Sequence, residues 1–295
     1  MNPSPSVGII IINWNGLEDT IELINSIANI NYKNYKIFLV DNNSSDGSQQ
    51  KFKEKYLKNK KITLIFNKTN LGLAGGFNSG LKKSLKEKFN YSFIMNNDMV
   101  VDKNFLSLLI LEMEKNKKLA AAGPRIYYYS DKKRIWNTGV KFNLIGFKNS
   151  FQNELDYKVN SKNKIVDALD GAYLIRNSLL NKICLLEKDF FIMHEMSGWC
   201  IKANQRGYFS MIIPKSKIWH KVSRSVKEVG PLCAYYGSRN WLLLLKRTQP
   251  KLNYIIGSII YFSLIFPRFI YSKFKGRKFY LTKIIKGAID SFSKE

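Results

Sequence analysis

Val7-Gly-Ile-Ile-Ile-Ile12, followed at once by the polar cluster Asn13-Trp-Asn-Gly16, sets the architecture of the chain. The six residues are β-branched or small and do not alternate with polar ones. Such a run predicts a strand that is buried on both faces, as strands of parallel sheets are. The polar cluster then marks the carboxyl end of that strand.

The same pattern recurs three times before residue 130. Apolar runs at 36–40, 62–66 and 91–95 each end in a cluster of polar residues. Between the runs, apolar residues recur at helical spacing, as at Leu17, Ile21 and Ile24. Strands that alternate with helices predict an α/β fold with a Rossmann-like, mostly parallel central sheet flanked by helices. Ligands of such sheets bind outside the carboxyl ends of the strands, so four polar clusters predict one site.

The second half of the chain is less regular. From about Ser130 to Val166 no period is visible, which predicts irregular structure or a mobile segment. A helix is predicted from about Glu195 to Gly207, and a strand from Tyr208 that Pro214 would stop.

Composition and charge narrow the class of protein. The 295 residues allow one large domain or two small ones, and 45% hydrophobic residues exclude a disordered, collagen-like or multi-spanning membrane protein. A net charge of +26 predicts anionic partners such as phosphates, nucleic acid or acidic lipid. Three cysteines without a CxxC pair argue against a disulfide framework or thiolate zinc site and favour a reducing, cytoplasmic location. The N-terminus lacks the basic segment of a secretory signal, so none is expected.

The C-terminal part differs from the rest. Residues 240–295 carry 11 Lys and Arg against 2 Asp and Glu, and they include the uncharged 13-residue run Tyr254–Phe266 between basic flanks. The run is shorter than the roughly 20 residues of a spanning helix, and its flanks predict a helix lying in an anionic membrane interface. The alternative is a core helix with a solvated basic collar. Because the basic excess accompanies an apolar run and no nucleic-acid module is visible, we expect no nucleic-acid partner.

Phosphate-binding motifs are absent in their usual forms. The first turn lacks G-x-G-x-x-G, and Gly75-Gly-Phe-Asn-Ser-Gly80 is not followed by Lys-Ser/Thr. That run places glycines and Asn78 at an expected helix start, which suits an anion, although a plain turn is the commoner use. Asn96-Asn-Asp98 follows a buried strand and suits a divalent cation bound to a diphosphate; an Asn/Asp turn is the alternative.

Eight motifs follow one another along the chain: Ile-Ile-Asn-Trp-Asn-Gly (11–16), Val-Asp-Asn-Asn-Ser-Ser-Asp-Gly-Ser (40–48), Asn-Leu-Gly-Leu-Ala-Gly-Gly-Phe-Asn-Ser-Gly (70–80), Met-Asn-Asn-Asp (95–98), Asp-Gly-Ala-Tyr-Leu-Ile-Arg (170–176), Trp-Cys-Ile-Lys-Ala-Asn-Gln-Arg-Gly (199–207), Pro-Lys-Ser-Lys-Ile-Trp-His (214–220) and Tyr-Tyr-Gly-Ser-Arg-Asn (235–240). As an ordered set they resemble the family-2 glycosyltransferases of GT-A fold, and among these the rhamnosyltransferase-like members that build bacterial surface polysaccharides. The resemblance is weakest over 130–165.

The resemblance implies a GT-A domain over 1–240, with a nucleotide-binding half at 1–130 and an acceptor and catalytic half at 165–240, followed by the basic tail 241–295. It implies inverting transfer of a sugar, rhamnose-type favoured, from a dTDP- or UDP-sugar to a glycan or lipid-linked glycan acceptor in cell-envelope synthesis. The reaction would use Mg²⁺ or Mn²⁺ and take place at the inner face of the cytoplasmic membrane. The resemblance also admits a homodimer.

Residue roles follow from the matched motifs. Asp41 would read the nucleotide base, with Asn13 beside it, and Asp98 would bind the cation. His220 matches a histidine that completes the metal site in some relatives, but a structural histidine beside Trp219 is the alternative. The full set that the resemblance implies comprises Asn13, Asp41, Asn43, Asn70, Gly75, Asn78 and Asn96 for the nucleotide, Asp98 and His220 for the metal, Asp170, Gly171 and Trp199 for the acceptor or sugar, and Glu195 for catalysis.

One departure affects the general base. At the start of the helix predicted from about Glu195, relatives usually have Glu-Asp-x-Asp-Trp, and the first Asp is taken as the base. This chain has Glu195-Met-Ser-Gly-Trp199 instead. A thioether accepts no proton from a sugar hydroxyl. Three readings stay open: Glu195 is the base, His194 is the base, or the protein binds a nucleotide sugar and turns it over poorly. The last reading defines the competing function, a catalytically degenerate nucleotide-sugar binder.

Overall fold

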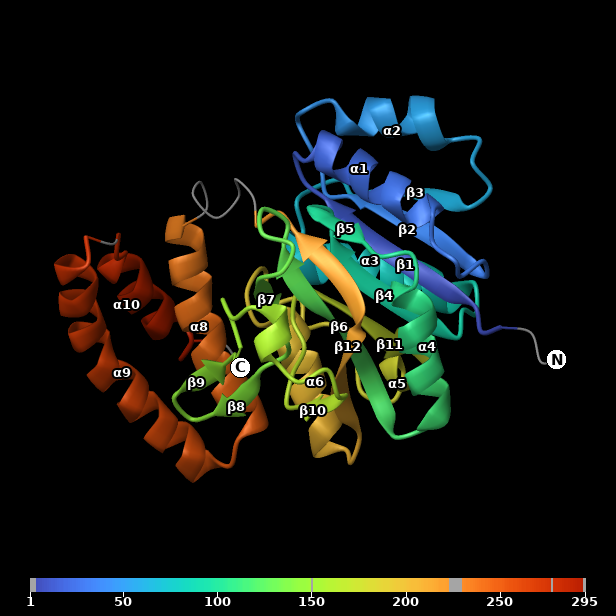
Figure 1. Ribbon diagram of the computed structural model, residues 1–295. Coiled ribbons are helices and arrows are strands. Elements are labelled where there is room, and N and C mark those ends of the chain that lie inside the picture. The colour runs from blue at the N-terminus through green and yellow to red at the C-terminus, as the bar shows by residue number, and fades with distance from the viewer. Residues whose placement is uncertain (1–3, 150, 223–229, 277, 294–295) are drawn as a thin grey trace.

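A ten-stranded sheet forms the centre of the molecule in the computed structural model, which describes residues 4–149, 151–222, 230–276 and 278–293 (Figure 1). Its order is β10-β12-β6-β11-β4-β1-β2-β3, and β5 and β7 pair with β12 and β6. The strands are β1 Val7–Asn13, β2 Tyr35–Asp41, β3 Ile62–Phe66, β4 Tyr91–Asn96, β5 Met99–Val101, β6 Leu119–Tyr128, β7 Ile135–Asn137, β10 Lys164–Val166, β11 Ala172–Arg176 and β12 Phe209–His220. Strands β1 to β4 are parallel, and β11 lies antiparallel between β4 and β6. The predicted α/β fold with a mostly parallel core is confirmed.

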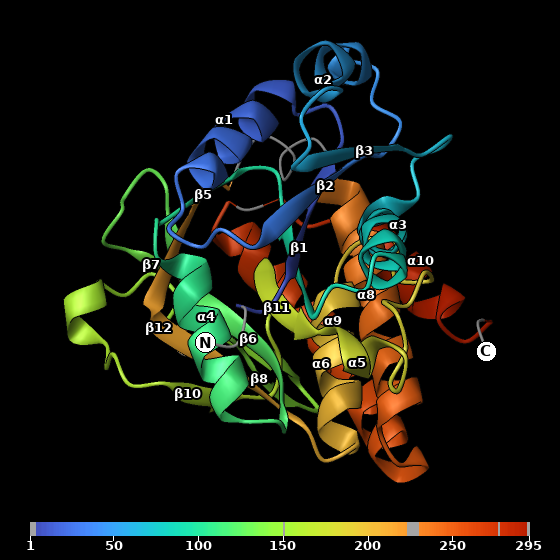
Figure 2. The same ribbon diagram turned by 90° about the vertical axis from the view of Figure 1, so that its right-hand side faces the viewer.

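Helices cover both faces of the sheet, as Figure 2 shows. The apolar residues of α1, α2 and α4 pack on one face, and those of α3, α5, α6 and α8 pack on the other. The bounds are α1 Leu17–Ala28, α2 Ser48–Tyr56, α3 Gly72–Lys86, α4 Phe105–Lys115, α5 Asn177–Leu180 and α6 Glu195–Gln205. Because every side chain of β1 from Val7 to Asn13 is buried, the unalternated run of the sequence is explained.

The region 130–166 is more ordered than its sequence suggests. It contains β7, a hairpin of β8 Lys141–Asn143 and β9 Gly146–Lys148, a short 3₁₀ helix at Asp156–Lys158, and β10. Most described residues of the region do lie outside helices and strands, as expected, but the short strands were missed because three residues are too few to show an alternating pattern. Likewise, β12 continues through Pro214, because a register shift against β6 between Ile213 and Lys217 accommodates the proline.

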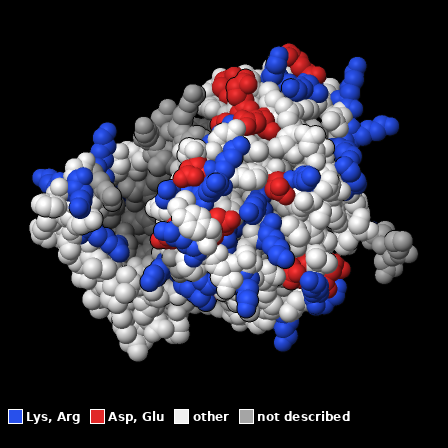
Figure 3. Space-filling view, viewed as in Figure 1, with Lys and Arg blue, Asp and Glu red and all other residues white. Residues whose placement is uncertain are grey.

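Three helices complete the chain: α8 Gly230–Thr248, α9 Lys251–Phe274 and α10 Leu281–Asp290. The expected boundary at residue 240 falls inside α8, whose apolar run Trp241–Leu245 is buried in the core. Helix α8 therefore belongs to the body of the protein, and the change of character comes at Pro250, where α9 begins. Figure 3 shows a hollow on the left of the molecule, where these C-terminal helices lie.

Candidate active site

A chain of hydrogen bonds crosses the carboxyl ends of the parallel strands. Asn13, at the end of β1, donates through Nδ2 to Asp41 Oδ2 (2.8 Å) at the end of β2. The Asn13 Oδ1 atom accepts from Asn97 Nδ2 (3.1 Å), directly after β4. Adjacent parallel strands bring these side chains together, as the sequence predicted. Asp41 and the Asn96-Asn97-Asp98 segment therefore belong to one network.

Asp41 lies deeper in the protein than expected for a residue that contacts a base. It is fully buried, and its oxygens accept from Asn13, from the Ser44 backbone N–H (3.0 Å) and hydroxyl (2.6 Å), and from Gln49 Nε2 (2.8 Å). These four bonds occupy the acceptor sites of a carboxylate. An incoming base reaches Asp41 only by displacing a donor such as Gln49. Base recognition by Asp41 stays a prediction. In the structure Asp41 holds the loop after β2 through its hydrogen bonds with Ser44 and Gln49.

Asp98 and His220 meet as predicted. Asp98 Oδ2 lies 3.1 Å from His220 Nε2, across the pairing of β12 with β5. The second ring nitrogen of His220 is buried without a hydrogen-bond partner, and so is Oδ1 of Asn96, two residues before Asp98. Oxygen and imidazole donors fit Mg²⁺ or Mn²⁺, and two protein ligands suffice where diphosphate oxygens supply the rest. Among the described residues no group of three or more His, Cys, Asp and Glu side chains could hold a metal without such help.

Asp170 and Glu195 form an acidic pair beside this centre. Glu195 begins α6, is 4% exposed, and has one carboxylate oxygen buried without a partner. Burial, followed by the charge of Asp170, raises the pKa of the Glu195 carboxyl to about 8. Asp170 is exposed to solvent, yet desolvation by the surrounding protein raises the pKa of its carboxyl, and the charge of His220 opposes that rise. A carboxyl that titrates near neutrality is suited to accept a proton from a hydroxyl.

A strained turn precedes Glu195. Met193 and His194 both have left-handed backbones, with φ of 73° and 68°, a conformation that costs about 1–3 kcal/mol for each non-glycine residue. Asn240, fully buried in α8, holds the turn by donating from Nδ2 to the carbonyl oxygens of Ile192 (2.8 Å) and Met193 (2.9 Å). Asn240 ends the Tyr235–Asn240 motif, but no role could be assigned to it from the sequence.

His194 is a poor candidate for the general base. Burial lowers the pKa of its imidazole to about 4. Its ring packs against Phe147 of the β8–β9 hairpin and against Trp241 of α8, with centroid distances of 5.1 and 6.0 Å. Of the two candidates that the sequence left open, the geometry favours Glu195.

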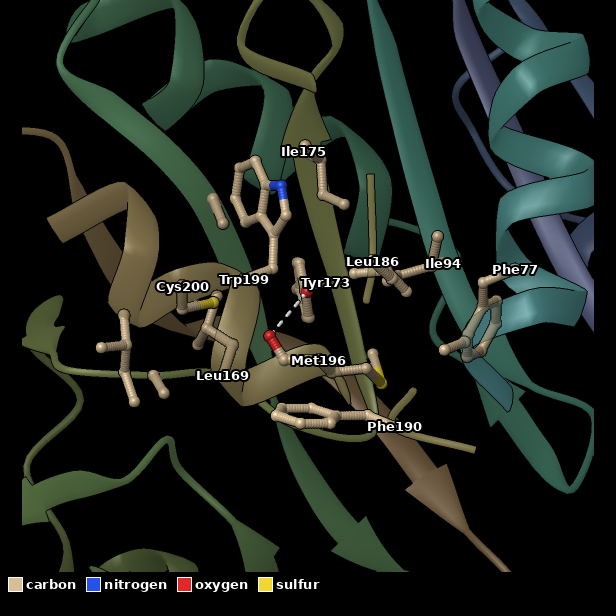
Figure 4. Close-up of a cluster of buried hydrophobic side chains, with 14 of the residues drawn as sticks. Phe77, Ile94, Leu169, Tyr173, Ile175, Leu186, Phe190, Met196, Trp199 and Cys200 are labelled. Carbon is tan, nitrogen blue, oxygen red and sulfur yellow. Dashed lines mark hydrogen bonds between the residues drawn. The ribbon is translucent and has the colours of Figure 1, made fainter. Parts of the chain in front are cut away.

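Met196 and Trp199 face the core instead of the site (Figure 4). Met196 lies among buried apolar side chains, and its carbonyl accepts from the Tyr173 hydroxyl (3.0 Å). Trp199 is 2% exposed, donates to the Cys184 carbonyl (2.9 Å) and stacks on Tyr173. The expectation that Trp199 contacts acceptor or sugar is therefore wrong. Position 196 is a core position in this chain, about 100° around the helix from Glu195.

Gly75 and Asn78 also have structural roles. Helix α3 begins at Gly72, so both residues lie inside it and present no free helix-start N–H groups, contrary to the prediction. Asn78 uses its whole amide on the backbone of Leu186, donating to its carbonyl (2.7 Å) and accepting from its N–H (3.0 Å). A Cβ at Gly75 would lie 2.6 Å from Leu71 Cβ, which explains the glycine by packing.

The remaining predicted residues lie in the strand-end loops. Asn70 accepts from the Gly72 N–H (2.9 Å) at the start of α3, and its Oδ1 also accepts from Asn42 (2.8 Å), a buried residue that the sequence reasoning missed. Asn43 is exposed with φ of 64°. Gly171 has φ of 81° and no room for a Cβ, which would lie 2.9 Å from the Trp136 ring.

Trp136 is a further residue that the sequence did not reveal. It is half-buried at the centre of β7, and its ring meets the His220 ring edge to face at 4.3 Å. It therefore lies beside both Gly171 and the Asp98–His220 pair. Its neighbours in the sequence carry no period, so no pattern marked it.

Comparisons with known proteins identify relatives of this chain. The sequence model of glycosyl transferase family 2 matches residues 8–184. A dTDP-rhamnosyl transferase, RfbF of Shigella flexneri, is 24% identical over 274 residues, which cover 90% of this chain and 88% of that protein. An uncharacterized glycosyltransferase of Haemophilus influenzae is 28% identical over 123 residues, 42% of this chain and 37% of that one.

Solved structures share the fold at low identity. Mannosyltransferase PcManGT from Pyrobaculum calidifontis, solved with GDP-Man and Mn²⁺, has a TM-score of 0.62 at 13% identity and covers 100% of this chain and 89% of that chain. GalNAc-T7, solved with UDP, GalNAc and Mn²⁺, also has a TM-score of 0.62, at 15% identity, covering 82% of this chain and 51% of that chain. The fold is that of the GT-A glycosyltransferases, and the chain belongs to glycosyl transferase family 2.

Proposed function

We propose that the protein is an inverting sugar transferase that uses a nucleoside diphosphate sugar, with a dTDP- or UDP-linked rhamnose-type donor favoured, and a glycan or lipid-linked glycan acceptor of the cell envelope. The observation that carries the proposal is the meeting of Asp98 and His220 beside the acidic pair Asp170 and Glu195. The relationship to a dTDP-rhamnosyl transferase supports the donor class.

The described residues divide the work of a single displacement. Glu195 accepts the proton of the acceptor hydroxyl as that oxygen attacks the anomeric carbon on the face opposite the leaving group. Asp98 and His220 would hold a divalent cation, which supplies positive charge for the departing diphosphate. Asn13 and Asp41 keep the strand-end loops in the shape that receives the nucleotide, and Asp170 raises the proton affinity of Glu195.

Nucleotide release tests the proposal directly. Purified protein is incubated with dTDP- and UDP-sugars, with and without Mn²⁺, and with a pool of envelope glycans and lipid-linked glycans. We expect nucleoside diphosphate release that needs both acceptor and cation, and at least a hundredfold less with Glu195→Gln. The exposed Glu18→Gln variant is the matched control.

Met196 favours one competing function, a nucleotide-sugar binder without turnover. That function predicts thermal stabilisation by a donor, about 2.7 kcal/mol at 100 times its Kd, with no diphosphate released from any pool. Stabilisation without release would replace the transferase proposal by this one.

We also propose a cytoplasmic location at the inner face of an anionic membrane. All three cysteines, Cys184, Cys200 and Cys233, are free thiols in the structure, which suits a reducing compartment. By length and composition helix α9 is long and apolar enough to cross a membrane, and only 11% of its most apolar window is buried in the protein.

A further inference from the structure

Helix α9 presents an apolar stripe that nothing in the described structure covers. Leu252, Ile256, Ile259, Phe266, Ile270 and Phe274 are all exposed, by 40% to 84%. Their spacing of three, four or seven residues puts them on one side of the helix. The opposite side packs on the body of the protein, where Gly257 touches Leu245 of α8.

Helix α10 extends this surface. Ile285, Ile289 and Phe292 are exposed by 40% to 60% and recur at helical spacing. The rings of Phe262 in α9 and Phe292 after α10 stack at 6.3 Å with an interplanar angle of 10°. The two helices therefore share one apolar surface, which we call the α9–α10 face.

Charge identifies what the face binds. Exposed cations lie on the two helices or next to them: Lys251, Arg268, Lys273, Lys275, Lys283 and Lys286. The segment 252–267 carries no charge, and the acid within α10, Asp290, is engaged by the Tyr235 hydroxyl (2.6 Å). In Figure 3 this part of the surface is mostly uncharged, with Lys and Arg at its upper end. An apolar stripe between cations complements anionic lipid, because each cation near such a surface raises the affinity about fivefold.

The fold decides how α9 meets the bilayer. At about 1.5 Å per residue its 24 residues would reach across a hydrocarbon core of roughly 30 Å. However, α10 is fixed to α8: a Cβ at Gly287 would lie 2.2 Å from the Tyr235 carbonyl oxygen, and Ser238 donates to the Ile284 carbonyl (2.7 Å). A spanning α9 would carry α10 to the far side of the membrane and break this packing. Both ends of α9 are thus held on one side.

We propose that the α9–α10 face docks in the plane of one anionic leaflet, with neither helix crossing it. This inference deepens the proposed function: if the transferase activity holds, the acceptor is carried by a lipid of the same leaflet. The link is α8, which supports α9 and α10 on one side and holds the turn before Glu195 through Asn240 on the other. The docked surface and the turn before the general base are therefore both held by α8.

Vesicle binding tests the face without any substrate. The full chain is mixed with phosphatidylcholine vesicles that contain about 30% phosphatidylglycerol, and bound protein is measured by cosedimentation. We expect Ile259→Glu and Phe266→Glu each to weaken binding at least tenfold, and pure phosphatidylcholine to bind at least tenfold less. Leu57→Glu, directly after α2, and Leu111→Glu, on α4, change exposed apolar residues away from the face and are matched controls that should bind like the parent. Equal binding by the face variants, or no binding by the parent, overturns the proposal.

Labelling from outside the vesicles tests the orientation. Ser293→Cys lies beyond α10, and a membrane-impermeant maleimide added after binding should modify it to completion, more slowly than in free protein because Phe292 beside it belongs to the docked face; the modified peptide is identified by mass. Complete protection of position 293 would mean that α9 spans the bilayer and would overturn in-plane docking. Because neither measurement involves sugar transfer, a failure of the docking face is distinguishable from a failure of the proposed activity.

Discussion

Replacing Glu195 by Gln should change how stability depends on pH. Burial and the charge of Asp170 raise the pKa of this carboxyl from 4.5 to about 8. A raised pKa means that the folded state binds the proton more tightly than the unfolded state, so the stabilising contribution is full below pH 4.5 and is lost as the pH rises toward 8. A tenfold change in proton affinity is worth about 1.4 kcal/mol. Between pH 5 and pH 9 the free energy of unfolding of the parent protein should therefore fall by about 4 kcal/mol relative to that of Glu195→Gln.

Thermal melts of both proteins across this pH range measure the effect. At about 2 °C per kcal/mol for a chain of this size, the Tm of Glu195→Gln should gain about 8 °C on the parent between pH 5 and pH 9. Any fixed cost of the buried amide cancels, because only the change with pH counts. Glu18→Gln, at an exposed acid of α1, should stay parallel to the parent. Parallel curves for Glu195→Gln would show that Glu195 is not secluded, and the assignment of the general base would fail with it.

Three other changes separate the roles of the site residues. Met196→Asp puts a carboxylate into the apolar cluster, so urea unfolding should show a loss of about 3 kcal/mol or more without any gain in transfer, whereas Met196→Leu should cost under about 1.5 kcal/mol. His220→Ala should raise the Mn²⁺ concentration for half-maximal transfer about tenfold or more, and an unchanged cation dependence would remove His220 from the metal site. Asn240→Ala should lower kcat about tenfold with the donor KM unchanged, because it frees the turn before Glu195; a loss confined to stability would refute a positioning role.

The parallel half of the fold could be predicted from sequence because its strands are buried on both faces. The run Val7–Ile12 matches β1 Val7–Asn13 to within one residue, and the polar ends of the strands do form one network. Short strands gave no such signal. Strand β7 has only three residues, so its central residue, Trp136, was not predicted to lie in the site.

The part of the candidate site that could be predicted consists of residues that belong to a motif and also lie at the end of a strand of the sheet. Asp98 and His220 are 122 residues apart, yet the pairing of β5 with β12 brings them within 3.1 Å. The side of α6 that faces the site could not be predicted. The motif places Trp199 and the carboxylate position that Met196 occupies in the site, whereas both side chains are buried in the core. Only packing decides which side of α6 faces Asp170. Asn240 was missed because a bond to a carbonyl 47 residues away leaves no local pattern.

The segment matched by the family model ends at residue 184, before Glu195, His220 and Asn240. Two adjacent left-handed residues next to the glutamate are kept in place by an amide that arrives from a helix near the end of the chain. Chimeras that join foreign C-terminal helices to this body must therefore keep an asparagine at position 240. Without it the turn at Met193 and His194 relaxes, and the Glu195 carboxyl is no longer held in place. The body of this protein therefore extends to the end of α8, well beyond the segment that the family model matches.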